Sequence, residues 1–64
     1  MNWEVFGTIM REERIKKGMT QQELAEIVEV TSESISYYEA GKKRPSFEKM
    51  KIICNTLGIS MDSL

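Results

Sequence analysis

The charged side chains of this 64-residue chain are grouped along the sequence, and they are the first candidates for chemistry. Two basic clusters contain Arg11, Arg14, Lys16 and Lys17, and then Lys42, Lys43, Arg44, Lys49 and Lys51. Between them lie Glu23, Glu26, Glu29, Glu33 and Glu39. The net charge of −1 argues mildly against a nucleic-acid partner, but clusters of one sign matter more for phosphate binding than the sum.

The residue types needed for most catalysis and for metal binding are scarce. The chain has no histidine and one cysteine, Cys54, so a disulfide, a Cys/His zinc site and a Ser-His or Cys-His pair are excluded within it. Paired carboxylates remain conceivable as acid and base, but a core this small leaves little room for an enclosed pocket. We therefore expect no enzymatic activity, no metal and no cofactor.

Length and hydropathy predict one small domain over residues 1–64. A hydrophobic content of 41% is sufficient for one compact core, although only about 60% of the unfolded chain's surface can be buried at this size. There is no charged lead followed by an apolar segment, and no apolar run long enough to span a membrane. We therefore expect a cytoplasmic protein without a signal peptide or membrane contact, with its cysteine reduced.

The elements that must position these side chains read as short helices. Trp3, Phe6, Met10 and Arg14 share one face of a first helix, which Gly18 can end. No segment alternates cleanly enough between apolar and polar residues to predict a strand. The sequence therefore favours an all-α fold.

A second helix has a clear start signal. Thr20 and Glu23 have the spacing of a capping box, and Met19 can pack against Leu24 as a hydrophobic staple. The inward positions of this helix are Leu24, Ala25 and Val28.

After a break near residues 29–30, Thr31 can cap a third helix running from about Thr31 to Tyr38. Ile35 and Tyr38 face inward, and Gly41 can end it. This is the segment whose outward side chains matter below.

A fourth helix opens at Pro45 and Ser46 and ends at Gly58. Its expected inward positions are Phe47, Met50, Ile53, Cys54 and Leu57. Ser60 predicts a fifth helix, with Ile59 and Leu64 as a second staple. The sequence thus predicts five short helices.

The segment from Thr20 to Pro45 resembles the helix-turn-helix of XRE-like regulators, the phage repressor and Cro (Cro/C1) type. The matching positions are Thr20, Gln21, Glu23, Leu24, Ala25, Val28, Val30, Ile35, Ser36, Glu39, Gly41 and Pro45. Arg14 and the segment from Ser46 to Leu64 extend the match over nearly the whole chain. The resemblance implies a compact five-helix lambda-repressor-like domain, with its helix-turn-helix at about residues 20–41.

The resemblance also implies a function and a set of contact residues. It implies sequence-specific binding of double-stranded DNA by a bacterial or phage transcriptional regulator, with helix 31–38 in the major groove. A repressor acting by occupying its operator is expected, because no effector domain is visible in the chain. The implied base-reading residues are Thr31, Ser32, Glu33, Ser36 and Tyr37, and the implied phosphate-binding residues are Gln21, Lys42, Lys43 and Arg44. Arg14 and Glu39 are expected to form a structural ion pair.

Blander interpretations of the same residues stay open. Taken alone, Ser32, Glu33, Ser36 and Tyr37 describe an ordinary solvated helix face, and residues 42–44 describe a solvated loop. Tyr37 could also reach a phosphate rather than a base. The alternative function is a protein-interaction module, such as an antitoxin or a partner of another regulator.

Several positions depart from the family pattern or are ambiguous. Glu29 stands where the turn usually has glycine, and the reading helix lacks Arg, Asn and Gln, so we expect modest affinity for each chain. Trp3 can either cover the core or face a partner. Ile52, Met61 and Leu64 predict an exposed apolar patch, and we expect it to support a homodimer.

Overall fold

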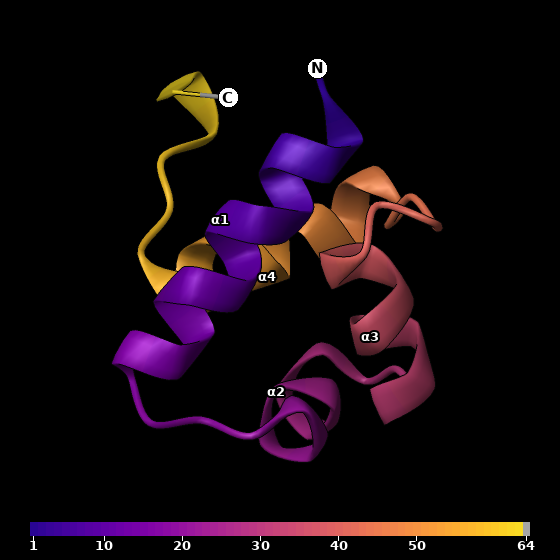
Figure 1. The fold of residues 1–64 in the computed structure, drawn as a ribbon. Coiled ribbons are helices and arrows are strands. Elements are labelled where there is room, and N and C mark those ends of the chain that lie inside the picture. Colours follow the sequence, from indigo (N-terminus) through magenta and orange to yellow (C-terminus); the bar gives the residue numbers. More distant parts are fainter. Residues whose placement is uncertain (64) are drawn as a thin grey trace.

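The computed structural model describes residues 1–63, and all regular elements within that range are helical (Figure 1). They are α1 (Trp3–Lys16), α2 (Gln21–Val28), α3 (Ser32–Glu39), α4 (Phe47–Leu57) and the 3₁₀ turn η1 (Met61–Ser63). The expected all-α fold is confirmed, but the expectation of five α-helices is wrong. Only η1 follows α4 within the described residues, since a three-residue segment suits i→i+3 bonds better than the α-helical ladder. Leu64, the expected second staple residue, lies outside them.

Side-chain caps fix the starts of α1 and α2. Asn2 Oδ1 accepts hydrogen bonds from the backbone N–H groups of Glu4 and Val5, at 3.0 and 3.1 Å. At α2 the predicted capping box is present: Thr20 Oγ1 accepts from Glu23 N–H at 3.0 Å, and Glu23 Oε1 accepts from Thr20 N–H at 2.9 Å. These bonds to Thr20 lower the pKa of Glu23 below its usual range. The box therefore contributes stability at neutral pH that is lost as the pH falls through that lowered value.

The starts of α3 and α4 are capped by hydroxyl groups. Thr31 Oγ1 accepts from Ser34 N–H at 3.0 Å, and Ser46 Oγ accepts from Lys49 N–H at 3.2 Å. Thr31 is thus the cap of α3 and not its first residue, and the helix continues to Glu39, one residue beyond the predicted end.

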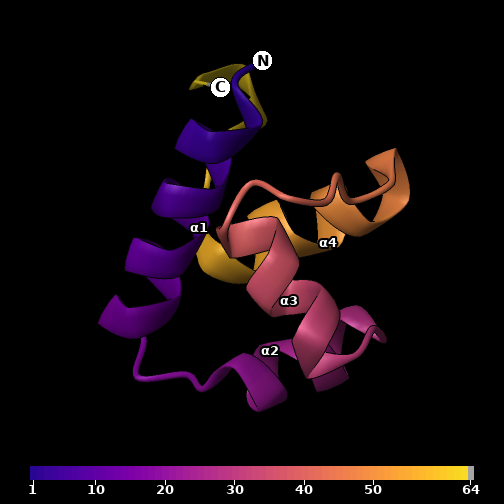
Figure 2. The ribbon, with the colours of Figure 1, turned by 45° about the vertical axis from the view of Figure 1, so that its right-hand side comes forward.

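The core lies where the inner faces of the four helices meet (Figure 2). Its buried members come from every α-helix, and they are Phe6, Met10, Leu24, Ala25, Val28, Ile35, Tyr38, Met50, Ile53, Cys54 and Leu57. The expectation that Phe47 joins them is wrong, because 69% of it is exposed. Phe47 is the first residue of α4, its ring lies under the Lys51 ammonium group with Nζ 5.6 Å from the ring centroid, and Pro45 takes a buried position instead.

The backbones of α1 and α3 approach each other closely at Gly7. A Cβ atom on Gly7 would lie 2.5 Å from the carbonyl oxygens of Tyr38 and Glu39. Only a residue without a side chain fits at this crossing, and the sequence analysis did not identify it. Gly7 therefore sets the distance between α1 and the end of α3.

The turn between α2 and α3 depends on a left-handed residue. Glu29 ends α2 with φ 63° and ψ 47°, a region that costs a non-glycine residue about 1–2 kcal/mol. It is the only non-glycine residue with positive φ among residues 1–63. The strain follows directly from glutamate standing where glycine is expected.

We predict that Glu29→Gly raises the melting temperature. The exposed Glu29 side chain contributes no packing, so relief of the left-handed strain should add about 1 kcal/mol, equivalent to roughly 4–8 °C for a domain of this size. Thermal unfolding followed by circular dichroism measures the change. Glu26→Gly, an exposed position inside α2, is the control and should cost about 1 kcal/mol. An unchanged or lower melting temperature for Glu29→Gly would contradict the strain argument.

Candidate nucleic-acid interface

The outer face of α3 presents hydroxyl and acidic groups to solvent. Glu33, Ser36 and Tyr37 are exposed, whereas Ile35 and Tyr38 on the opposite side are buried. Ser32, expected on the outward arc, is half-buried. The face that a DNA groove would meet is therefore narrower than the sequence predicts, and it centres on Glu33, Ser36 and Tyr37.

The side chain of Thr31 already has local hydrogen-bond partners. Its hydroxyl accepts from Ser34 N–H and donates to Ser34 Oγ, both at 3.0 Å. A base contact by Thr31 would have to replace or share these bonds. Thr31 thus shapes the start of α3 before it can read anything.

A buried network joins three helix ends behind α3. Arg14 donates to Glu39 from Nε to Oε2 at 2.6 Å and from Nη2 to Oε1 at 3.2 Å, and from Nη1 to the Met19 carbonyl at 2.8 Å. Gln21 Nε2 donates to Glu39 Oε1 at 3.1 Å. Both ionic side chains are almost inaccessible to solvent, at 10% for Arg14 and 3% for Glu39. The network fixes α3 relative to the end of α1 and the start of α2.

The basic residues 42–44 lie in the connection between α3 and α4, and two of them contact the fold. Lys43 Nζ donates to Ser34 Oγ at 3.2 Å and lies 5.9 Å from the centroid of the Tyr38 ring. The Arg44 guanidinium lies 5.7 Å from the Trp3 ring centroid. Lys42 is exposed. All three cations are therefore on the connection that follows α3, and Lys43 reaches back along that helix.

Trp3 packs on the core, the first of the two interpretations that the sequence leaves open. It is half-buried, and its ring meets the Phe6 ring edge to face, with centroids 5.9 Å apart and planes at 83°. Such a pair favours one ring orientation.

Lys49 supports the helix-turn-helix from α4, and the sequence analysis did not assign it this role. Its ammonium group donates to the Val28 carbonyl at the end of α2, at 3.0 Å, in a partly buried position. A cation near a helix C-terminus satisfies a free carbonyl and complements the helix dipole. Lys49 is thus a structural contact beside the strained turn.

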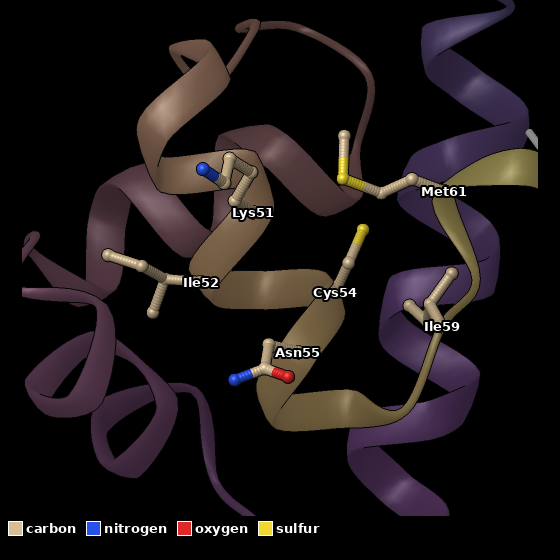
Figure 3. Close-up of a pocket in the computed structure, with 6 residues that line it drawn as sticks. All are labelled: Lys51, Ile52, Cys54, Asn55, Ile59 and Met61. Atoms are coloured by element: carbon tan, nitrogen blue, oxygen red, sulfur yellow. The ribbon is translucent and has the colours of Figure 1, made fainter.

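A separate hollow of about 480 Å³ lies between α4 and the segment that follows it (Figure 3). It is lined by Lys51, Ile52, Cys54, Asn55, Ile59 and Met61. Ile52 and Met61, two members of the expected apolar patch, thus share one depression. Burial raises the pKa of the Cys54 thiol, which keeps it protonated and unreactive at neutral pH.

Residues 1–63 contain no group of three or more His, Cys, Asp or Glu side chains placed to hold a metal ion. None of the helices in that range is long and apolar enough to cross a membrane.

The model of the helix-turn-helix family matches residues 10–64. The chain belongs to this family. The expected resemblance to XRE-type helix-turn-helix regulators is thereby confirmed, and the relatives below are named as transcriptional regulators. The match begins within α1 and includes the whole of α2, α3 and α4.

Three similar proteins illustrate the relationship. The HTH-type transcriptional regulator YonR of Bacillus subtilis is 33% identical over 60 residues, covering 94% of this chain and 56% of YonR. The HTH-type transcriptional activator BcrR of Enterococcus faecalis is 34% identical over 59 residues, covering 92% of this chain and 29% of BcrR. The crystal structure of the clp gene regulator ClgR from Corynebacterium glutamicum superposes with a TM-score of 0.88 at 35% identity, covering 98% of this chain and 67% of that chain. The chain therefore spans about half or less of the length of these two sequence relatives.

Proposed function

We propose that this helix-turn-helix domain, residues 1–64 with its core at about 20–41, binds double-stranded DNA sequence-specifically as a transcriptional regulator. The observation that carries the proposal is the exposed face of α3, which the buried Arg14–Glu39 pair holds at the surface with basic residues directly after it. A major groove about 12 Å wide admits a helix in this orientation. The family membership of the chain supports the same role.

Base contacts are assigned to the outer face of α3. Ser36 offers a hydroxyl to either donor or acceptor edges, and Glu33 can accept from a cytosine amino group. Tyr37 reaches a base or a phosphate, since 43% of it is exposed. Thr31 and Ser32 lie at the start of the helix and contribute at the margin of the contact, because the Thr31 hydroxyl is already bonded and Ser32 is half-buried.

Phosphate contacts are assigned to residues on both sides of α3. Gln21 begins α2. Its side-chain amide has two hydrogens and donates only one of them to Glu39, so the other remains for a phosphate oxygen. Lys42, Lys43 and Arg44 bind the backbone of the same half-site. These contacts orient the domain without reading sequence.

A homodimer that represses transcription by occupying its operator completes the proposal. Two copies would read half-sites about one helical turn apart, roughly 34–36 Å. The hollow lined by Ile52, Ile59 and Met61 is the surface assigned to self-association, because it is the apolar depression on the side of α4. BcrR is named an activator, so a reporter gene with the operator inside its promoter tests the sign of regulation, and repression is the expected result.

The face of α3 can be tested by removing its side chains. Ser36→Ala combined with Tyr37→Ala should weaken binding to the preferred duplex at least about tenfold without unfolding the domain, since both side chains are exposed. Fluorescence anisotropy with a labelled duplex measures the affinity. Thr8→Ala, an exposed hydroxyl on α1, is the matched control and should bind as the wild type does. Equal loss in both proteins, or no loss in either, would reject α3 as the reading helix.

The same titration repeated over a range of salt tests the phosphate contacts. Three cations per chain predict a slope of log K against log salt of about −2.7 for each half-site, at about 0.9 for each neutralised phosphate, and about twice that for a dimer on two half-sites. A flat salt response would contradict backbone binding by residues 42–44.

The second candidate is a protein-interaction module, such as an antitoxin or a partner of another regulator. The apolar hollow and the acidic residues Glu29 and Glu33 favour it, because both suit a protein surface better than a phosphate backbone. Under this alternative the Ser36→Ala and Tyr37→Ala substitutions leave the partner contact through the hollow unchanged.

A further inference from the structure

The start of α1 forms a support for the basic connection between α3 and α4. The connection passes beside the first turns of α1 (Figures 1 and 2). At Gly41 the two segments are so close that a Cβ atom would lie 2.9 Å from Glu4 Cα and 3.2 Å from Glu4 N. Pro45, at the far end of the basic residues, is buried. The backbone that carries the three cations is therefore fixed at both ends.

Arg44 is the cation whose side chain contacts the start of α1. Its guanidinium lies over the Trp3 ring, and the edge-to-face contact with Phe6 holds that ring in turn. A cation–π contact uses the charge of the guanidinium and not its hydrogen-bond donors, so its N–H groups stay available to other acceptors. An arginine can therefore be held by an aromatic ring and still donate a bidentate pair of hydrogen bonds to a phosphate.

We infer that Trp3 is a positioning residue for DNA binding: it holds Arg44 in the orientation in which its N–H edge meets a backbone phosphate. The inference rests on the proposed DNA-binding function. A long side chain that is already ordered in the free protein loses less conformational freedom when the phosphate binds. The N-terminal turn of α1 thus takes part in binding through Arg44 and without touching the DNA.

A double-mutant cycle tests the coupling between the two side chains. Binding of a fluorescein-labelled duplex of mixed sequence is measured at low salt for the wild type, Trp3→Leu, Arg44→Ala and the double variant. Trp3→Leu should weaken binding about two- to tenfold, the cost of ordering one long side chain on binding. In the Arg44→Ala background the same substitution should have no further effect, because the side chain it positions is gone.

Two comparisons separate positioning from a general loss of structure. In a Lys42→Ala background, where the missing cation is not the one over the Trp3 ring, Trp3→Leu should weaken binding as much as it does in the wild type. Trp3→Phe keeps an aromatic ring and should weaken binding less than Trp3→Leu. All variants are compared at a temperature at which circular dichroism shows them folded. If Trp3→Leu does not fold, Trp3→Phe replaces it in the double-mutant cycle.

The outcomes are distinguishable. Equal weakening by Trp3→Leu in the wild-type and Arg44→Ala backgrounds would overturn the inference, since Trp3 would then act through stability alone. Unchanged binding by Trp3→Leu in the wild-type background would overturn it as well. A wild-type chain that does not bind the duplex at low salt would instead reject the proposed function.

Discussion

Glu39→Ala is expected to remove about half of the protein's stability, a loss of about 3–5 kcal/mol. The substitution leaves the Arg14 guanidinium buried without its counter-ion and removes the acceptor of the Gln21 amide. Removing one partner of a buried ion pair costs about 3–5 kcal/mol. At about 0.05–0.15 kcal/mol per residue, a chain of 64 residues has roughly 3–10 kcal/mol of total stability. Urea unfolding followed by circular dichroism measures the loss.

An exposed ion pair on α1, the helix that carries Arg14, is the control. Lys16 and Glu13 are joined at 3.1 Å, but 72% of the lysine side chain is accessible, so Glu13→Ala should cost less than about 1 kcal/mol. Arg14→Met combined with Glu39→Met should cost less than the sum of the two single changes, because no charge is left buried alone. Additive single changes, or a Glu39→Ala cost comparable to that of Glu13→Ala, would show that the network does not fix α3.

Gly7→Ala is expected to destabilise the domain by about 3 kcal/mol, although alanine is the better helix former. The added methyl group would lie 2.5 Å from two backbone carbonyl oxygens at the end of α3, and backbone cannot move aside as a flexible side chain can. α1 and α3 would have to separate, which disturbs the Arg14–Glu39 pair between them. Thermal unfolding should show a fall in melting temperature on the order of 12–24 °C.

The sign of the Gly7→Ala effect is decisive. If helix propensity dominated, the substitution would stabilise α1 by about 1 kcal/mol. Gly18→Ala is the control with open space around it: no heavy atom lies within 4 Å of the added Cβ, so it should cost only the left-handed backbone penalty of about 1–2 kcal/mol. A higher melting temperature for Gly7→Ala would contradict the close crossing of α1 and α3.

Local chemistry made most of the fold predictable. Hydrogen-bonding caps such as Thr20 and Thr31 act within three residues of the chain, so their spacing in the sequence identifies the helix starts. The inward positions of α2 and α3 follow the helical period and are all buried. Even the unusual backbone at Glu29 was foreseeable, because the family pattern has glycine at that position.

Features that depend on contacts between distant segments were not predictable. Phe47 has the same spacing as its buried neighbours on α4, and only the edge of the core explains its exposure. Gly7 looks like a weak point of α1 until the approach of α3 is known. The short η1 reflects the same limit, since a capping residue at Ser60 does not reveal how many residues follow in helical form.

The candidate site divides in the same way. Outward positions such as Ser36 and Tyr37 follow from the period of α3, and the structure exposes both. The partners of the phosphate-binding candidates do not follow from the sequence: the Gln21 amide donates a hydrogen bond to Glu39, and the Arg44 guanidinium makes a cation–π contact with Trp3. These contacts join residues 18 and 41 positions apart, and no local pattern records them.

Selection of bound sequences from a random duplex library tests the central claim most directly, because it examines sequence preference and half-site spacing together. The predicted result is an enriched, roughly palindromic site whose half-site centres lie about one helical turn apart, roughly 34–36 Å. The enrichment should be lost with Ser36→Ala combined with Tyr37→Ala and retained with Thr8→Ala. Recovery of no preferred sequence, or of the same sequence with the α3 variant, would contradict a reading role for α3.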